Sequence, residues 1–286
     1  MLAVKDTHKA WLARCLLLFA ACAGLWAFWW IREAERPLLA HGDGYICSDS
    51  DSFMRARLLQ DAATGGPLNP RTWENHNWPE GIASHWTAPN TIAGLGIFNL
   101  MRLFAPDEKA ACMSAFYLGP VLGSVSLLLL AWLGWRTGGW MLALAWMLAW
   151  PALDDVLAVT RLGCADHHAL HQMLMILVAG LLVSSKRSRV SGLLTGMAAG
   201  ISTWSAALEL APFLASMIAL GIWDSRNTPD AARHWRAAWI TASAITVLGI
   251  FFEYGSGPWS AHLEYLSMIH LPLWLLAGAL LEYSAR

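Results

Sequence analysis

The residues best suited to chemistry lie in the segment RLGCADHHALH, residues 161–171. Asp166 and His168 alternate, so in an extended backbone both side chains point the same way and could bind one ion. A carboxylate with an imidazole suits a divalent ion such as Mn²⁺, and Mg²⁺ less well. If a helix begins here instead, Asp166 is a good N-cap and the histidines surround the first turn. The short spacing alone leaves both interpretations open.

A second acidic segment is DSDSFMRARLLQD, residues 49–61. Asp49 and Asp51 alternate in the same way, and the residues that follow have helical spacing. One interpretation is a solvated turn in which Asp51 or Ser52 caps a helix. The other is that a carboxylate here completes the metal site of the first segment. Such a site would neutralise the charge that develops on a phosphate leaving group.

Other residues are candidates for binding substrate. Arg161 could stabilise phosphate charge, or its side chain could extend to lipid headgroups. Glu209 lies at or within an apolar stretch, where acids are costly and usually functional; it could bind an acceptor or a metal, or satisfy a buried Trp or Ser. His85 and Trp86 belong to an aromatic surface that could be a platform for polyprenyl or sugar groups, although such belts are ordinary at membrane interfaces.

The composition indicates what must position these residues. Hydrophobic residues make up 57% of the 286, charged residues only 14%, and eighteen are tryptophan. A soluble domain usually carries about 25% charged residues. The composition therefore excludes an ordinary soluble enzyme, a disordered chain and a small disulfide scaffold. The net charge of -1 gives no indication of nucleic-acid binding. We expect an all-α, polytopic transmembrane bundle.

Runs of about 20 apolar residues predict the membrane spans. The first is at 11–31, and the others are at 110–134, 137–157, 168–184, 190–205, 207–223, 236–252 and 268–283, about eight in all. The segment 92–104 is too short to span and is expected to lie in the interface or re-enter. The prediction is a single transmembrane domain over 1–286, with a long outer loop at 32–109, remaining spans in 110–286 and no soluble C-terminal domain.

Basic residues in the tight turns predict the orientation. Arg136, the cluster at 186–189 and the arginines at 226, 233 and 236 share a side with the N-terminus. The positive-inside rule makes that side cytoplasmic in a cell inner membrane. Both acidic segments then lie on the periplasmic face, away from soluble nucleotides. Cys47 and Cys164 also lie there and could form a disulfide if their backbones come close enough.

Together these segments resemble those of oligosaccharyltransferase catalytic subunits, within the GT-C superfamily of membrane glycosyltransferases. The resemblance rests on Asp51-Ser-Phe in the first outer loop and on Gly163-Cys-Ala-Asp166-His-His168 in the second, with Arg161 upstream. It implies a bundle of the GT-C type. It also implies that a divalent metal, Mn²⁺ or Mg²⁺, is bound by Asp51, Asp166 and His168, and less securely by Asp49 and His167. Asp51, Asp166 and Glu209 are the predicted catalytic residues.

The resemblance also implies a substrate class. The donor would be a sugar linked to polyprenyl (di)phosphate in the membrane, and the acceptor a protein, a glycan or a lipid on the periplasmic face. The resemblance covers the N-terminal half of such enzymes, and their W-W-D triad does not occur in this sequence. A second chain could supply a missing C-terminal half. The alternatives are a non-catalytic polyprenyl-lipid-binding or transport protein, and an inactive truncated half of a larger transferase.

Overall fold

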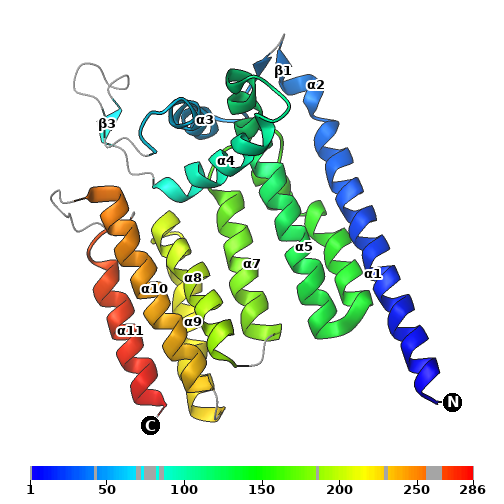
Figure 1. Ribbon diagram of the computed structural model, residues 1–286, viewed down its shortest axis with the longest axis vertical. Helices are drawn as coiled ribbons and strands as arrows, with labels where there is room; N and C mark the ends of the chain where they lie inside the picture. The colour runs from blue at the N-terminus through cyan, green and yellow to red at the C-terminus, as the bar shows by residue number, and fades with distance from the viewer. Residues whose placement is uncertain are drawn as a thin grey trace. The chain divides into compact units, whose positions relative to one another are not determined.

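The chain is almost entirely helical in the computed structural model (Figure 1). The residues described are 2–41, 44–68, 72–73, 82–83, 87–184, 187–228, 231–255 and 266–285. Two short antiparallel pairs are the strands described, β1 (Ala40–His41) with β2 (Gly44–Tyr45) and β3 (Thr72–Trp73) with β4 (Ile82–Ala83). The chain forms two compact units, the first made of Met1–Ala56 and Met101–Ser184 and the second of Arg57–Leu100 and Ser185–Arg286.

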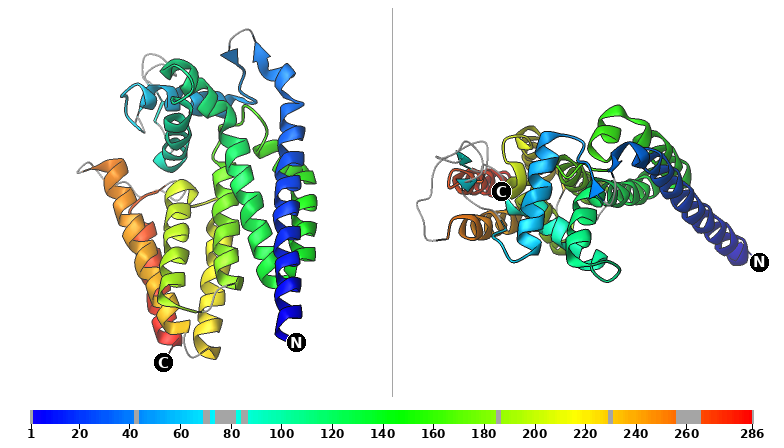
Figure 2. Two further views of the ribbon diagram at one scale, coloured as in Figure 1. Left: turned by 45° about the vertical axis from the view of Figure 1, so that its right-hand side comes forward. Right: turned by 90° about the horizontal axis from the view of Figure 1, so that it is seen from above.

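The first unit is built around a long apolar helix, α5 (Asp107–Ala149). Helix α1 (Leu2–Glu33) and helix α7 (His168–Ser184) pack against α5, and Figures 1 and 2 show α1 running alongside it. Phe28 from α1 and Leu127 from α5 are fully buried in the shared apolar core. The unit also contains α2 (Arg36–Leu39), the start of α3 (Ser50–Ala63), the 3-10 turn Trp150–Ala152 and α6 (Asp154–Val159).

Helix α5 is two helices joined at a sharp reversal. Gly139 has a φ of 75°, which an L side chain adopts only with strain. A Cβ on Gly134 would lie 2.7 Å from the backbone of Ala143, so the chain folds back on itself here. The sequence predicts two spans in this region, at 110–134 and 137–157. The reversal is therefore found, a few residues later than the sequence indicates.

The second unit holds the rest of α3 together with α4 (Ala88–Met101), α8 (Arg189–Ala206), α9 (Ala211–Asn227), α10 (Ala231–Tyr254) and α11 (His270–Ser284). Helices α8 and α10 touch through glycine. A Cβ on Gly192 would lie 2.1 Å from the carbonyl oxygen of His234, and one on Gly196 would lie 2.2 Å from that of Ala238. Because both partners advance by four residues, the two helices are parallel, and small residues let their backbones approach closely.

The helices agree with the predicted apolar segments, but fewer of them qualify as membrane spans. Within the residues described, three helical stretches are long and apolar enough to cross a membrane, namely Trp11–Leu39, Asp107–Ala152 and Ala231–Tyr254; His168–Val183 is a shorter apolar helix. Helix α4 covers most of the 92–104 segment and has only 14 residues, as expected of a segment too short to span. The structure therefore supports a membrane protein with at least these candidate spans, where the sequence predicts about eight.

Candidate functional site

The two acidic segments meet within the first unit, although 113 positions separate Ser52 from Ala165. The backbone N–H of Ala165 donates a hydrogen bond of 3.1 Å to the Ser52 hydroxyl. The N–H of Ser48 donates to the carbonyl of Gly163 at 3.0 Å. Arg161 donates to the Ser48 carbonyl at 3.2 Å. The two segments are thus joined by backbone and side-chain hydrogen bonds.

Gly163 makes this close approach possible. Its φ is 76°, and a Cβ at this position would lie 2.7 Å from the carbonyl oxygen of Ile46. Its N–H donates to the carbonyl of Phe116 in α5 at 2.9 Å. A glycine is therefore required here both by backbone conformation and by space, three residues before Asp166.

Asp49 caps helix α3. Its Oδ1 accepts from the Ser52 N–H at 2.7 Å, and its Oδ2 accepts from the hydroxyls of Ser52 at 2.9 Å and Ser48 at 2.6 Å. Burial raises the pKa of Asp49, as does the charge of Asp166, but the serine hydrogen bonds outweigh both effects and the pKa is lowered. The sequence predicts Asp51 or Ser52 as the cap. The helix begins at Ser50, so the capping position falls on Asp49 instead.

Asp166 is buried among donors, with 7% of the residue exposed. Its Oδ1 lies 3.3 Å from Nε of Arg55 and 2.5 Å from Nδ1 of His167, and it accepts from the His167 N–H at 2.7 Å. Its Oδ2 lies 3.2 Å from Nε2 of His168. Burial alone would raise the pKa of Asp166, but the hydrogen bond and charge of His167 and the charge of Arg55 lower it. The group is held as a carboxylate.

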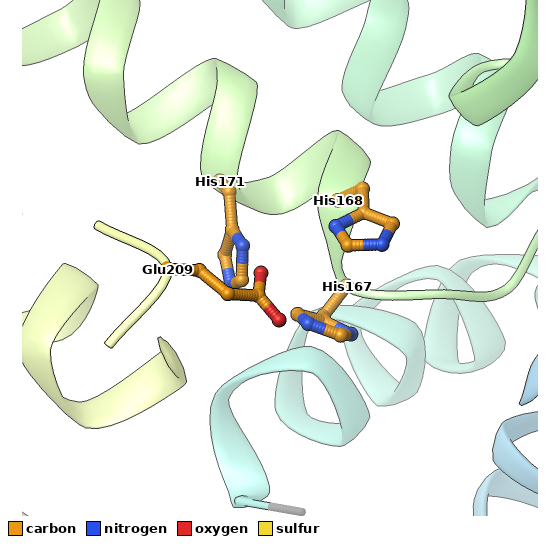
Figure 3. Close-up of side chains that lie close together, drawn as sticks. All are labelled: His167, His168, His171 and Glu209. Atoms are coloured by element: carbon orange, nitrogen blue, oxygen red, sulfur yellow. The ribbon is translucent and has the colours of Figure 1, made fainter. Parts of the chain in front are cut away.

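Three histidines stand together where α7 begins (Figure 3). The ring of His167 lies 4.5 Å, between centroids, from the rings of both His168 and His171. One ring nitrogen from each of the three lies within 4.8 Å of those of the others. His171 is buried, whereas the side chain of His168 is 49% exposed. Helix α7 begins at His168, so a helix does begin in this segment, but the capping position falls on His167 and not on Asp166 as expected. Asp166 and His168 still lie together.

The other predicted residues fall in different places. Asp51 is exposed on α3, and within the residues described no ion pair joins it to His168. Arg161 is half-buried and holds the loop through Ser48. Glu209, also drawn in Figure 3, is exposed and belongs to the second unit, between α8 and α9. His85 and Trp86 lie outside the residues described.

One residue at the site is not singled out by the sequence. Arg55 is buried, and its guanidinium lies 2.9 Å from Nδ1 of His167, in addition to its ion pair with Asp166. The sequence feature that could have identified Arg55 is its position three residues after Ser52, because this spacing puts both side chains on the same, buried face of α3. His171, by contrast, belongs to the segment 161–171 that the sequence indicates, and the structure shows it buried within α7.

The cysteines of the two segments are free thiols. The structure has both Cys47 and Cys164 unpaired, so the disulfide considered from the sequence is not formed. Burial, followed by the charges of Asp49 and the neighbouring thiols, raises the pKa of Cys47 to about 11. Burial likewise raises the pKa of Cys164. Both thiols therefore remain protonated near neutral pH, and neither is a ready nucleophile.

The fold is that of the N-terminal part of an archaeal oligosaccharyltransferase. The apo enzyme from Archaeoglobus fulgidus superposes with a TM-score of 0.78 at 12% identity, over 97% of this chain and 33% of that one. The same organism's AglB in complex with an inhibitory peptide and a dolichol-phosphate gives 0.73 at 13% identity, over 97% and 33%. The oligosaccharyltransferase from Archaeoglobus fulgidus in complex with Zn and sulfate gives a TM-score of 0.74 at 12% identity, over 94% of this chain and 35% of that one.

This chain thus spans about a third of the length of the enzymes whose fold it shares. At such identities the likeness shows the fold alone. No protein-family model matches the sequence, and no curated protein matches it either.

Proposed function

We propose that this protein is a GT-C-type membrane glycosyltransferase that moves a sugar or oligosaccharide from a polyprenyl (di)phosphate donor to an acceptor on the periplasmic face. The observation that carries the proposal is the junction of the two acidic segments around Asp166, on a fold shared with the N-terminal third of AglB. AglB has been solved with a dolichol-phosphate and with a tethered acceptor peptide. A lipid-linked donor and a peptide acceptor are therefore the first substrates to test.

The donor set fits a divalent ion. Two atoms that bind one ion at about 2.1 Å lie roughly 3.0–3.4 Å apart for octahedral to tetrahedral angles. The 3.2 Å between Oδ2 of Asp166 and Nε2 of His168 is within that range. A set that combines carboxylates with one imidazole suits a divalent ion such as Mn²⁺, and Mg²⁺ less well. We propose Asp166 and His168 as ligands, joined by the predicted Asp51 or by its neighbour Asp49.

The remaining residues of the site hold these ligands in place. His167 presents Nδ1 to the Asp166 carboxylate, an arrangement that favours the proton on Nδ1 and leaves Nε2 as an acceptor. Arg55 keeps Asp166 ionised by pairing with Oδ1, so that Oδ2 faces His168. A bound divalent ion would supply charge neutralisation for the phosphate leaving group as the bond between sugar and phosphate breaks.

A groove in the second unit has the chemistry of a lipid-chain site. Its volume is about 280 Å³, and its lining is almost wholly aliphatic, with Trp274 and His270 among the few other side chains. A polyprenyl chain is a suitable occupant, because a branched hydrocarbon gains only from apolar contact. The same groove would serve a non-catalytic polyprenyl-binding protein, which is the second candidate function. That candidate predicts lipid binding that survives both chelation and Asp166→Asn.

The test is metal binding and glycan transfer by the purified chain and by two variants. Asp166→Asn and His168→Ala should each weaken Mn²⁺ affinity by more than about tenfold and abolish transfer from a polyprenyl-linked donor. Asp155→Asn removes an exposed carboxylate from α6 in the same unit and should change neither measurement. Wild-type Mn²⁺ affinity in both site variants would show that the metal site is assigned to the wrong residues.

The roles of Asp51, Asp49 and Glu209 are tested with separate variants. Asp51→Asn and Asp49→Asn, compared side by side, show which of the two contributes to metal binding. Glu209→Gln should reduce transfer if Glu209 is catalytic, as the sequence predicts. Unchanged transfer in that variant would remove Glu209 from the site.

A further inference from the structure

A basic pocket lies in the second unit, at the N-terminal ends of α8 and α10. Its volume is about 330 Å³, and its wall includes Arg189, Arg233 and Arg236. Arg236 donates to the Glu282 carboxylate at 2.7 Å. Within the part of the chain that is described, no hydrogen bond or ion pair engages the side chain of Arg189 or Arg233. The pocket therefore carries two guanidinium groups that no described carboxylate compensates.

The backbone adds to this positive charge. Helices α8 and α10 are parallel, as the contacts of Gly192 and Gly196 show, so both N-termini lie at the same end. The N-terminus of a helix carries a partial positive charge and orphan N–H donors, which favour an anion. Two adjacent N-termini with arginines in their first two turns are suited to a phosphate group, which arginine binds in a bidentate way.

The other wall of the pocket is apolar. Leu193 lies one turn beyond Arg189 on α8, and Ile240 lies two turns beyond Arg233 on α10. The two residues are 40% and 48% exposed. The seven residues from Arg233 to Ile240 advance about 10 Å along the helix. Over that distance the pocket changes from charged to apolar, as a bilayer does between its headgroups and its hydrocarbon core. Helix α10 is itself one of the candidate spans.

We propose that this pocket binds an anionic phospholipid of the adjoining leaflet. The phosphodiester lies between the guanidinium groups of Arg189 and Arg233, and an acyl chain lies against Leu193 and Ile240. The bound lipid ties α8 to α10 and stabilises the second unit. None of these residues belongs to the site around Asp166, so the proposal stands or falls independently of the proposed function.

The experiment measures the melting temperature of the delipidated full chain in detergent, with added phosphatidylglycerol, phosphatidylcholine, glycerol 3-phosphate or inorganic phosphate. Phosphatidylglycerol should raise the melting temperature, and the three other additions should raise it much less. The variant R189Q/R233Q should bind phosphatidylglycerol at least about tenfold more weakly, because it loses the charge-assisted hydrogen bonds of both guanidinium groups. Arg226→Gln, an exposed arginine of α9 outside the pocket, is the matched control and should respond like wild type.

The outcomes separate the sources of the phosphate. An unchanged response of R189Q/R233Q to phosphatidylglycerol would overturn the proposal, and so would inorganic phosphate acting as strongly as the lipid. Both arginines are exposed, so the single variants R189Q and R233Q should fold. Native mass spectrometry of each single variant should then show fewer bound phosphatidylglycerol molecules than Arg226→Gln retains. Equal retention contradicts the site even if the double variant fails to fold.

Discussion

At the scale of single residues, Asp166 depends on Arg55. Both residues are almost fully buried, and their charges are paired at 3.3 Å. Removing one partner of a buried pair leaves an uncompensated charge, which costs about 3–5 kcal/mol. We expect Arg55→Met to destabilise the protein by that amount, and the double variant with Asp166→Asn to recover part of the loss. Thermal unfolding in detergent measures both.

The control for this cycle is Arg57→Met. Arg57 pairs with Asp61 at 3.2 Å, but its side chain is 59% exposed, so the pair contributes at most about 1 kcal/mol. A loss from Arg55→Met no larger than that from Arg57→Met would show that the buried pair does not hold the site together.

The sequence could predict part of this site. Asp166 and His168 followed from residue type and spacing, and the structure places them 3.2 Å apart. Arg55 could not be assigned, because its role depends on where α3 begins and on which face of that helix meets residues 161–167. The N-cap of α3 could likewise not be assigned from the sequence alone. Asp49, Asp51 and Ser52 are all good capping residues, and only the start of α3 at Ser50 selects Asp49.

At the scale of elements, the glycines of α8 determine how closely two helices pack. A Cβ on Gly192 would lie 2.1 Å from the carbonyl oxygen of His234, which is backbone and has little freedom to move. Gly192→Ala should therefore force α8 and α10 apart and destabilise the protein by about 1–3 kcal/mol or more. The measurement is again the melting curve.

Gly96→Ala is the matched substitution. Gly96 lies in α4 with open space where a Cβ would stand, so alanine should be neutral or stabilise by up to about 1 kcal/mol through helix propensity. Equal effects of the two substitutions would mean that the α8–α10 contact is looser than the structure shows.

A buried carboxylate couples the second unit to pH. Asp224, near the end of α9, accepts from Trp235 and Thr228 at 2.9 Å and pairs with Arg187. Burial raises its pKa, but the hydrogen bonds from Trp235, Arg187 and Thr228 outweigh this, and the pKa is lowered. A lowered folded-state pKa means that its stabilisation is present above the unfolded pKa of about 4 and is lost as the pH falls through the folded value.

Melting temperature measured from pH 7 down to pH 3 tests this coupling. Wild type should lose stability on acidification more steeply than Asp224→Asn, which has no carboxylate to protonate at this position. Parallel curves for the two proteins would show that Asp224 does not contribute to the acid sensitivity.

Apolar periodicity predicted where the helices lie better than where they turn. The break expected near residues 135–136 lies at Gly139, because the tight reversal depends on a positive φ and on the contact of Gly134 with Ala143. Hydropathy does not record either feature. The pairing of α8 with α10 also required the structure, although the glycines at four-residue intervals were visible in the sequence.

At the scale of the whole molecule, this chain covers about a third of the length of the enzymes whose fold it shares. The chain overlays about 33% of the oligosaccharyltransferase from Archaeoglobus fulgidus. Composition predicted the helical membrane class, and the acidic segments predicted the resemblance to oligosaccharyltransferases, whose fold the chain shares. The division into two units followed from neither, because it depends on contacts between distant helices.

The orientation in the membrane is a prediction that can be measured in cells. Seven basic residues in the turns favour the cytoplasmic side, so the loop after α3 should face the periplasm and the end of α9 the cytoplasm. In a cysteine-free background, a membrane-impermeant maleimide should label Thr64→Cys in intact cells and should label Asn227→Cys only after lysis. Both positions are exposed, so access rather than burial decides the result. The reverse pattern would place Asp166 and the three histidines on the cytoplasmic face, and a donor from the periplasmic leaflet could then not reach them.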